Sequence, residues 1–260
     1  MNWNPDRYLR FSEERALPFR HLVAAVDHHD PSTVVDLGCG PGGMTATLLE
    51  RWPETRITGI DSSEEMIAHA RRWAVAGRLE FEIGDLLTWR PQESVDLMLA
   101  SASFHWIDDH RVLFDHLLPH LSERGSLAFQ VPANHTEPSH TILGMLCSSP
   151  RWCDRLGGLP RTGVREPQWY LDEFGVRGLE VNAWQTTYFH ILEGEDPVLE
   201  WVRGTTLRPV LERLPEEEHE EFLNEYGAHL REAYPSRDSI TVFPFKRTFV
   251  VARGRANDER

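Results

Sequence analysis

Short apolar runs, many of them β-branched, alternate along this chain with longer amphipathic stretches. The apolar runs predict strands at residues 34–37, 56–61, 79–83, 95–100, 125–131, 179–190 and 241–253. The stretches between them predict helices at about 18–26, 44–51, 64–74 and 109–120, and one long helical block at 197–234. Strands and helices in alternation are typical of an α/β fold with a mostly parallel sheet and helices on both faces.

The turn after the first strand carries closely spaced glycines. Residues 34–42 are V-V-D-L-G-C-G-P-G, and a helix-forming stretch follows them. Glycines at such a turn let the backbone approach a ligand with no Cβ in the way. Gly38, Gly40 and Gly43 also satisfy the dinucleotide pattern G-x-G-x-x-G, so the turn alone does not name the nucleotide. A plain strand-to-helix turn is the simpler explanation of the same residues.

Carboxylates at the next strand ends narrow the choice of ligand. Asp61, about twenty residues past the glycines, is placed to accept hydrogen bonds from a ribose diol. Asp85 with Leu86 suits an adenine, whose amine the acid accepts and whose ring the leucine covers. Together with Asp36 these acids fit a cation better than a pyrophosphate, and S-adenosylmethionine carries both an ammonium and a sulfonium. The candidate cofactor contacts from these turns are Asp36, Gly38, Gly40, Asp61, Ser62, Met66, Asp85, Leu86 and Ser101.

The later part of the chain predicts a second structural layer. Residues 137–177 carry prolines, tryptophans and glycines in irregular order, and residues 195–235 form a helical block between the last two strands. We expect both segments to form a substrate-facing cap or lid, since open α/β folds bind ligands at the carboxyl ends of their strands. The core then comprises residues 1–190 with 241–253, and residues 254–260 form a flexible tail.

Composition excludes some classes of partner. The 260 residues are 40% hydrophobic, which suits one globular domain with room for an insertion. A formal net charge of −14 argues against a nucleic-acid substrate, because phosphates are repelled at long range. No long uncharged apolar stretch and no basic-then-apolar N-terminus are present, so we expect a cytoplasmic protein without a membrane partner.

The cysteines indicate neither a disulfide scaffold nor a metal site. Cys39, Cys147 and Cys153 are an odd number, and no pair among them has the spacing of zinc ligands. We expect no metal and see no sign of an obligate protein partner. Cys39 is a small residue under a close-packed ligand rather than a nucleophile.

Sequence blocks spread over the chain resemble one family. The glycine turn, G-I-D-S-S at 59–63 and G-D-L at 84–86 resemble class I S-adenosylmethionine-dependent methyltransferases. Further blocks resemble trans-aconitate methyltransferases: N-W-N-P-D-R-Y-L-R-F-S at 2–12, A-S-F-H-W at 102–106, P-A-N-H-T-E-P-S-H at 132–140, W-Q-T-T-Y-F-H at 184–190, W-V-R-G-T-T-L-R-P at 201–209 and F-P-F-K-R-T-F-V-V-A at 243–252. The resemblance covers nearly the whole chain and implies a Rossmann-like, seven-stranded fold with a helical lid between the last two strands.

The resemblance also implies roles for particular residues. In similar methyltransferases the N-terminal segment folds over the cofactor, so Tyr8 and Arg15 are expected to contact its methionine part. A carboxylate acceptor is already ionised and needs counter-charge rather than a general base. We therefore expect His105 to position the acceptor, with substrate contacts from Trp106, Asn134, Tyr170, Tyr188, His190, Arg208 and Arg247. Arg208 and Arg247 are the best counter-ions, although a surface or interdomain salt bridge would equally account for either one.

We therefore expect an O-methyltransferase that esterifies a carboxylate of a small polyacid, for which the resemblance favours trans-aconitate. Leu17 stands where an arginine is common in the family, and the triplet 189–191 lacks the usual polar residue after its histidine, which favours an acid with fewer carboxylates. The first alternative is the same fold methylating another small or lipid-like acid or a phenolic oxygen. Further alternatives are a nicotinamide-dependent oxidoreductase, against which Asp85 stands, and a cofactor-binding protein without turnover.

Overall fold

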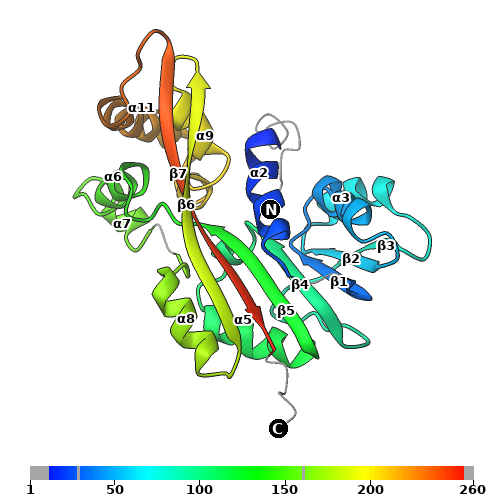
Figure 1. Cartoon of the computed structure of the whole chain (residues 1–260). Coiled ribbons are helices and arrows are strands. Elements are labelled where there is room, and N and C mark those ends of the chain that lie inside the picture. The colour runs from blue at the N-terminus through cyan, green and yellow to red at the C-terminus, as the bar shows by residue number, and fades with distance from the viewer. Residues whose placement is uncertain (1–11, 28–29, 160–161, 255–260) are drawn as a thin grey trace. The chain divides into compact units, whose positions relative to one another are not determined.

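A computed structural model of the chain contains a seven-stranded sheet with the order β3-β2-β1-β4-β5-β7-β6 (Figure 1). The structure describes residues 12–27, 30–159 and 162–254. The strands are β1 (Thr33–Leu37), β2 (Arg56–Asp61), β3 (Leu79–Ile83), β4 (Val95–Ser101), β5 (Leu121–Pro132), β6 (Glu180–Glu193) and β7 (Ile240–Arg253). Strands β1 to β5 pair in parallel and β7 runs antiparallel to β5, so the predicted mostly parallel α/β sheet is confirmed.

Helices alternate with the strands in chain order. They are α2 (Ser12–Ala24), α3 (Gly43–Arg51), α4 (Glu64–Ala70), α5 (His110–Leu117), α6 (Pro138–Cys147), α7 (Cys153–Leu156), α8 (Pro167–Gly175), α9 (Pro197–Arg203), α10 (Arg208–Leu211) and α11 (Glu216–Ala233). No helix among the described residues combines the length and apolar content that crossing a bilayer requires.

The chain divides into two compact units. Unit 1 takes its described residues from 1–132, 163–186 and 247–260, and unit 2 from 133–162 and 187–246. Strands β6 and β7 contribute residues to both units. The segment 137–177, expected to belong to the cap, is divided between the units after residue 162 and contains the helices α6, α7 and α8.

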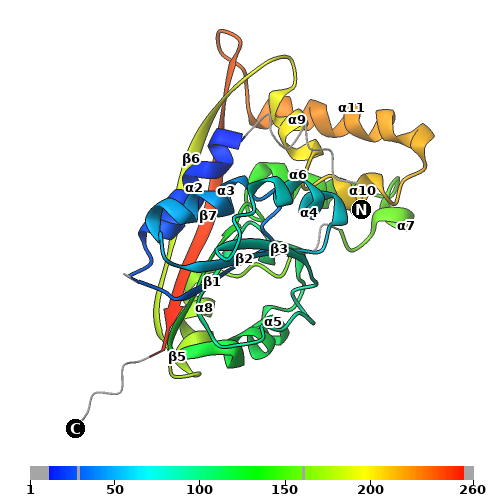
Figure 2. The ribbon, with the colours of Figure 1, turned by 90° about the vertical axis from the view of Figure 1, so that its right-hand side faces the viewer.

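Unit 1 is a three-layer structure around the sheet. Helices α2, α3 and α4 lie on one face, and α5 and α8 lie on the other (Figures 1 and 2). Its core is rich in aromatic residues: Phe104, Phe114, Phe129 and Phe174 are fully buried, and the rings of Phe114 on α5 and Phe174 on α8 lie 4.5 Å apart. Burial of this apolar surface is the main favourable term in the free energy of folding.

Unit 2 is built of helices on the outer halves of β6 and β7. The long helix α11 packs on α6 and α9. The hydroxyl of Tyr226 on α11 donates to the carbonyl of Ser139 on α6 at 2.5 Å, and the Tyr234 hydroxyl accepts from the Ser139 amide at 3.1 Å. Trp152 packs edge-on against Phe222, with ring centroids 5.3 Å apart.

The helical block predicted at 197–234 consists of the three helices α9, α10 and α11. Helix α9 ends at Arg203 before Gly204, α10 carries a proline in its first turn, and α11 begins only after Pro215. Glycine ends helices readily, and proline is tolerated only in a first turn because it has no amide hydrogen.

The parallel register fixes where the functional residues gather. Leu37 pairs with Ile60, Asp61 with Ile83, and Ser101 with Gln130. The carboxyl ends of β1 to β5 therefore meet at one edge of the sheet, which we call the carboxyl edge. The opposite edge, where Val95 pairs with Leu121, we call the amino edge.

Candidate active site

The glycine turn at the end of β1 has a backbone that other residues adopt only with strain. Gly38, Gly40 and Gly42 have φ values of 83°, 56° and 77°, in the left-handed region. A Cβ on Gly38 would collide with the Cβ of Ser103, and one on Gly42 would come within 2.8 Å of the Phe81 ring. The turn is therefore packed so closely that its exposed side presents bare backbone.

Asp61, at the end of β2, ties this turn to the neighbouring strand. Its Oδ2 accepts from the amide of Gly40 at 2.9 Å, and its Oδ1 accepts from the amide of Ser63 at 2.9 Å. Burial raises the pKa of Asp61, and these two backbone donors oppose the rise. Each carboxylate oxygen can still accept a further hydrogen bond, as ribose recognition requires.

Asp36 provides a second buried carboxyl beneath the same turn. It is 3% exposed, and its Oδ2 accepts from the Thr45 hydroxyl at 2.6 Å. Burial raises the pKa of Asp36 to about 6; the Thr45 hydrogen bond lowers it, and the nearby charge of Asp61 raises it further. A cation placed at this turn would favour ionisation of both acids. These two carboxylates therefore suit the ammonium and sulfonium of S-adenosylmethionine, and they would repel a pyrophosphate.

The remaining predicted cofactor residues lie at the ends of β2, β3 and β4. Asp85 is exposed and its Oδ1 accepts from the Leu87 amide at 2.8 Å, while Leu86 beside it is half-buried. Ser62 is exposed and Met66 is 3% exposed in the first turn of α4. Tyr8 lies outside the described residues, and Arg15 lies in α2 without a described side chain.

The loop after β4 is fastened to the glycine turn. The hydroxyl of Ser103 donates to the carbonyl of Leu37 at 2.6 Å, and the amide of Ala102 donates to the carbonyl of Gln130 at 2.9 Å. Ala102 has a φ of 55°, an uncommon conformation for a residue with a Cβ. Strain of this kind gathers at functional sites, where the surrounding structure enforces it.

Arg247 lies in unit 1, buried at the carboxyl edge. It is 4% exposed, and its Nη1 donates to Oε1 of Gln130 at 2.8 Å. Gln130, 1% exposed, in turn donates from Nε2 to the hydroxyl of Ser101 at 2.8 Å. The sequence prediction named Arg247 and Ser101 but missed Gln130. The signal was present, because Gln130 is the single polar residue in the buried run 127–131.

His105 and Trp106 follow in a 3-10 helix, Phe104–Trp106. Their rings are 4.6 Å apart, and Trp106 is 43% exposed while His105 is half-buried. A wall of an open pocket has this kind of exposure, and core packing does not. Their predicted contact with the acceptor stays a prediction.

Tyr170, which the sequence predicts to contact the substrate, is linked to that segment through His110, and its contact with a ligand stays a prediction. It is fully buried, and its hydroxyl accepts from the Arg165 amide at 3.2 Å and bonds Nδ1 of His110 at 2.9 Å. The Nε2 of His110 lies 2.9 Å from the carbonyl of Phe104. Burial lowers the pKa of His110, which fits a neutral ring that donates from Nε2 to Phe104 and accepts at Nδ1. Tyr170 thus acts through His110 on the residues after β4, and sequence reasoning missed His110.

The other predicted substrate residues belong to unit 2. The side-chain oxygen of Asn134 accepts from the Lys246 amide at 2.8 Å, so the asparagine joins β7 to the start of α6. His190 stacks on Trp201 with ring centroids 4.4 Å apart. Arg208 lies 3.7 Å from the Glu212 carboxylate, and Tyr188 is 8% exposed.

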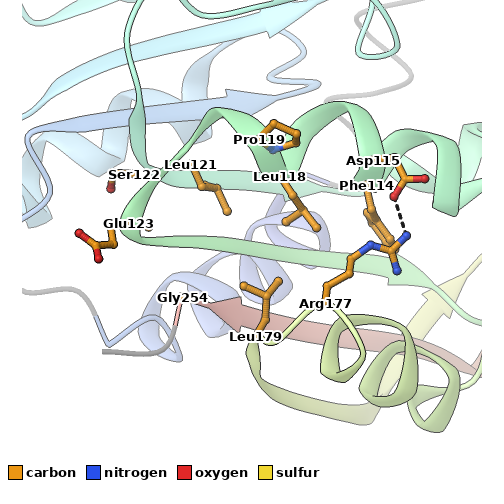
Figure 3. A pocket seen from close by; sticks show the side chains of 11 residues that line it. Phe114, Asp115, Leu118, Pro119, Leu121, Ser122, Glu123, Arg177, Leu179 and Gly254 are labelled. Carbon is orange, nitrogen blue, oxygen red and sulfur yellow. Dashed lines mark hydrogen bonds and ion pairs between the residues drawn. The ribbon is translucent and has the colours of Figure 1, made fainter. Parts of the chain in front are cut away.

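A cavity of about 380 Å³ lies at the amino edge of unit 1, away from all these residues (Figure 3). Arg177 is on its wall, and the close-up shows its guanidinium directed at Asp115, 2.6 Å away. The same arginine also pairs with Glu173. Because two carboxylates already neutralise this cation, the cavity offers no counter-charge for an anionic substrate. The lining residues are Phe114, Asp115, Leu118, Pro119, Leu121, Ser122, Glu123, Gly125, Arg177, Leu179 and Gly254.

Comparisons of the sequence with known proteins find methyltransferases. A family model described as a methyltransferase domain matches residues 34–125. A trans-aconitate 2-methyltransferase of Streptomyces avermitilis is 44% identical, over 98% of this chain and 98% of its own length. Another, of Streptomyces coelicolor, is 43% identical over 96% of this chain and 86% of its own length.

Solved structures agree on the fold. The YcgJ protein of Bacillus subtilis matches with a TM-score of 0.62 at 15% identity, covering 94% of this chain and all of its own. Identity this low carries the fold and nothing about the substrate. The full-length relatives, together with the acid-lined glycine turn, show that the chain belongs to the trans-aconitate 2-methyltransferase family of S-adenosylmethionine-dependent methyltransferases.

Proposed function

We propose that the chain esterifies a carboxylate of trans-aconitate with the methyl group of S-adenosylmethionine. The observation that carries this proposal is the buried carboxyl of Asp36 and the half-buried carboxyl of Asp61 at the glycine turn, with the buried Arg247 at the same edge of the sheet. The acids suit a cationic methyl donor, and the arginine suits an anionic acceptor. Relatives named trans-aconitate 2-methyltransferase supply the identity of the acid.

The chain's contribution to the donor is binding and orientation. S-adenosylmethionine supplies an electrophilic methyl group on its sulfonium. Asp61 would accept hydrogen bonds from the ribose diol. Asp85 would accept one from the adenine amine, and Leu86 would cover the adenine ring. The negative charge of Asp36 would stabilise a cation near the turn. Tyr8 and Arg15 remain predicted contacts of the methionine part.

The acceptor needs alignment rather than activation. A carboxylic acid with an ordinary pKa of roughly 4 is ionised at neutral pH, so its oxygen attacks without a general base. That oxygen forms the new bond to the methyl carbon as the carbon–sulfur bond breaks, and the electron pair of the broken bond stays on sulfur. The protein holds the two groups in line and excludes water. Arg247 can orient the acid through two parallel hydrogen bonds.

The remaining acceptor contacts belong to the proposal and rest on family-like blocks of sequence. These candidate contacts are His105, Trp106, Asn134, Tyr170, Tyr188, His190 and Arg208. Selectivity among acids is assigned in this proposal to the expected cap, residues 137–177 and 195–235. A cytoplasmic location fits the proposed small-acid substrate, and the charge of −14 disfavours nucleic acid.

Two positions favour an acid with fewer carboxylates as the second candidate. They are Leu17, which is 38% exposed, and Ile191 after His190, which is 59% exposed. Exposed apolar side chains provide no counter-charge and would contact a methylene or methyl group more favourably than a carboxylate.

The test is transfer of a labelled methyl group. The purified chain is incubated with S-adenosylmethionine bearing a deuterated methyl and with trans-aconitate, then with citrate and with monocarboxylic acids. We expect a monomethyl ester of trans-aconitate carrying the label, in amounts equal to the S-adenosylhomocysteine formed. A labelled ester of another acid, with none of trans-aconitate, would replace the named substrate by the second candidate.

A further inference from the structure

Gln130 is a polar side chain in an otherwise apolar strand core. It is 1% exposed on β5, between Phe129 and Val131, which are both fully buried. Burying an amide costs free energy unless its hydrogen-bonding groups are satisfied. Both ends of this amide are satisfied, one by Arg247 and the other by Ser101.

The strand register explains why these three side chains meet. Ser101 and Gln130 are paired in the parallel ladder of β4 and β5. Arg247 is paired with Pro132 in the antiparallel ladder of β5 and β7, two residues beyond Gln130. Residues two apart share a face of a sheet, so all three side chains lie on one face at the carboxyl edge.

The direction of the hydrogen bonds in this chain is fixed by chemistry. A guanidinium only donates, so Oε1 of Gln130 must face Arg247 and Nε2 must face Ser101. The Ser101 hydroxyl therefore accepts from Gln130. Its own hydrogen then points away from Gln130 and is directed to donate to another group.

We propose that Gln130 is a positioning residue that presents the Arg247 guanidinium and the Ser101 hydroxyl as two hydrogen-bond donors to the acceptor polyacid. This inference rests on the proposed function and deepens it. It assigns the Ser101 hydroxyl to the acceptor, although Ser101 was predicted as a cofactor contact. The Ala102 amide also donates to the Gln130 carbonyl, so the same residue fixes the backbone between the cofactor turn and the acceptor.

Two substitutions separate positioning from mere packing. Gln130→Met keeps the volume but removes both amide hydrogen bonds. Gln130→Glu keeps both contacts, but the new carboxylate neutralises Arg247 and only accepts, so Ser101 must turn its hydrogen toward it. A purely structural role would leave Gln130→Glu close to wild type, whereas a positioning role would not.

Gln185→Met is the matched control. Gln185 in unit 1 also makes two hydrogen bonds through its amide nitrogen, to Thr248 at 3.1 Å and to Glu166 at 3.1 Å. The Gln185→Met substitution removes as many side-chain hydrogen bonds as Gln130→Met does, and it leaves the contact between Gln130 and Arg247 in place. Methyl transfer to trans-aconitate, calorimetric binding of S-adenosylmethionine and thermal melting are measured for all three variants and for wild type.

We expect KM for trans-aconitate to rise about 10- to 100-fold in both Gln130 variants. Gln130→Met loses the hydrogen bond that holds Arg247, and Gln130→Glu neutralises Arg247 and draws the Ser101 hydrogen away from the acceptor. The cofactor Kd should change by less than about threefold, and Gln185→Met should match wild type. A wild-type KM in Gln130→Glu overturns the inference, and this variant decides the matter even where Gln130→Met fails to fold. Failure of wild type to methylate trans-aconitate is a separate result, which overturns the proposed function and this inference with it.

Discussion

The two edges of the sheet in unit 1 both carry charged residues, but they differ in which groups stabilise those charges. At the amino edge, Arg177 on the cavity wall is paired with Asp115 (Figure 3), and it also pairs with Glu173. At the carboxyl edge, burial raises the pKa values of Asp36 and Asp61, and among the described residues those acids accept hydrogen bonds from a hydroxyl and from backbone amides. Carboxyls that are stabilised by neutral hydrogen-bond donors are therefore better evidence of a ligand site than the volume of a cavity.

Removing one charged residue from each edge tests whether the two edges differ in their effect on S-adenosylmethionine binding. Asp61→Ala should weaken S-adenosylmethionine binding by about 100-fold, because it removes the ribose acceptor and the contact that holds Gly40. Arg177→Met at the amino edge should leave binding within about twofold of wild type. Isothermal calorimetry on both variants measures the difference. Equal losses in the two would mean that the edges are not functionally distinct.

Arg247 sharpens the comparison for the acceptor. Arg247→Met should raise KM for trans-aconitate by about 30-fold or more, because a buried cation that pairs with the acid is lost. The Kd of Arg247→Met for S-adenosylmethionine should equal that of wild type. Arg247→Lys keeps the charge but loses the fork geometry, so it should recover only part of the loss. Steady-state kinetics with each variant gives the values, and full recovery by lysine would count against bidentate binding.

The raised pKa of Asp36 should make the free energy of unfolding depend on pH. Burial raises its pKa from 3.8 to about 6, so between those pH values the folded chain keeps a proton that the unfolded chain has lost. Stability therefore falls as pH rises through this window and remains lower above it. Asp36→Asn should increase the free energy of unfolding at pH 8 by up to about 3 kcal/mol, with no gain at roughly pH 3.5. Denaturant melts of cofactor-free protein provide the test, and a gain independent of pH would point to another cause.

The smallest effect is expected at the amino edge itself. Arg177→Met should lower stability by about 1 kcal/mol, because it leaves Glu173 with one arginine, Arg111, in place of two. Methyl transfer should be unchanged. Thermal melting and the labelled-methyl assay measure the two quantities, and lost activity in a normally folded variant would give the cavity a role that the comparison denies it.

Local signals made the positions of the glycine turn and the strand-end acids predictable. The glycine turn, Asp61 and Asp85 each follow an apolar run in the sequence, and parallel strands bring such positions to one edge of the sheet. The acceptor side depends on pairings distant in sequence. Gln130 and Arg247 are separated by 117 positions, and nothing near Gln130 indicates that an arginine will lie beside it.

Burial was also hard to predict for single polar and aromatic residues. Tyr170 has the residue type of a ligand contact, yet its hydroxyl serves His110 inside an aromatic core. Asn134 likewise bonds the backbone of Lys246, a contact set by the meeting of β7 with the start of α6. Composition and spacing locate such residues in a family-like block, but packing decides which group each side chain contacts.

The most direct test of the account is proton release on cofactor binding. If the cation of S-adenosylmethionine binds beside Asp36, whose pKa is about 6, then binding at pH 6 must expel part of a proton from that carboxyl. Calorimetric titrations at pH 6 in buffers of different ionisation enthalpy measure this release. We expect wild type to release protons and Asp36→Asn to release fewer, because only Asp61 can then lose a proton to the bound cation. The affinity of wild type should fall about tenfold per pH unit below 6. Binding that is independent of buffer and pH, or the same release in both proteins, would contradict the account.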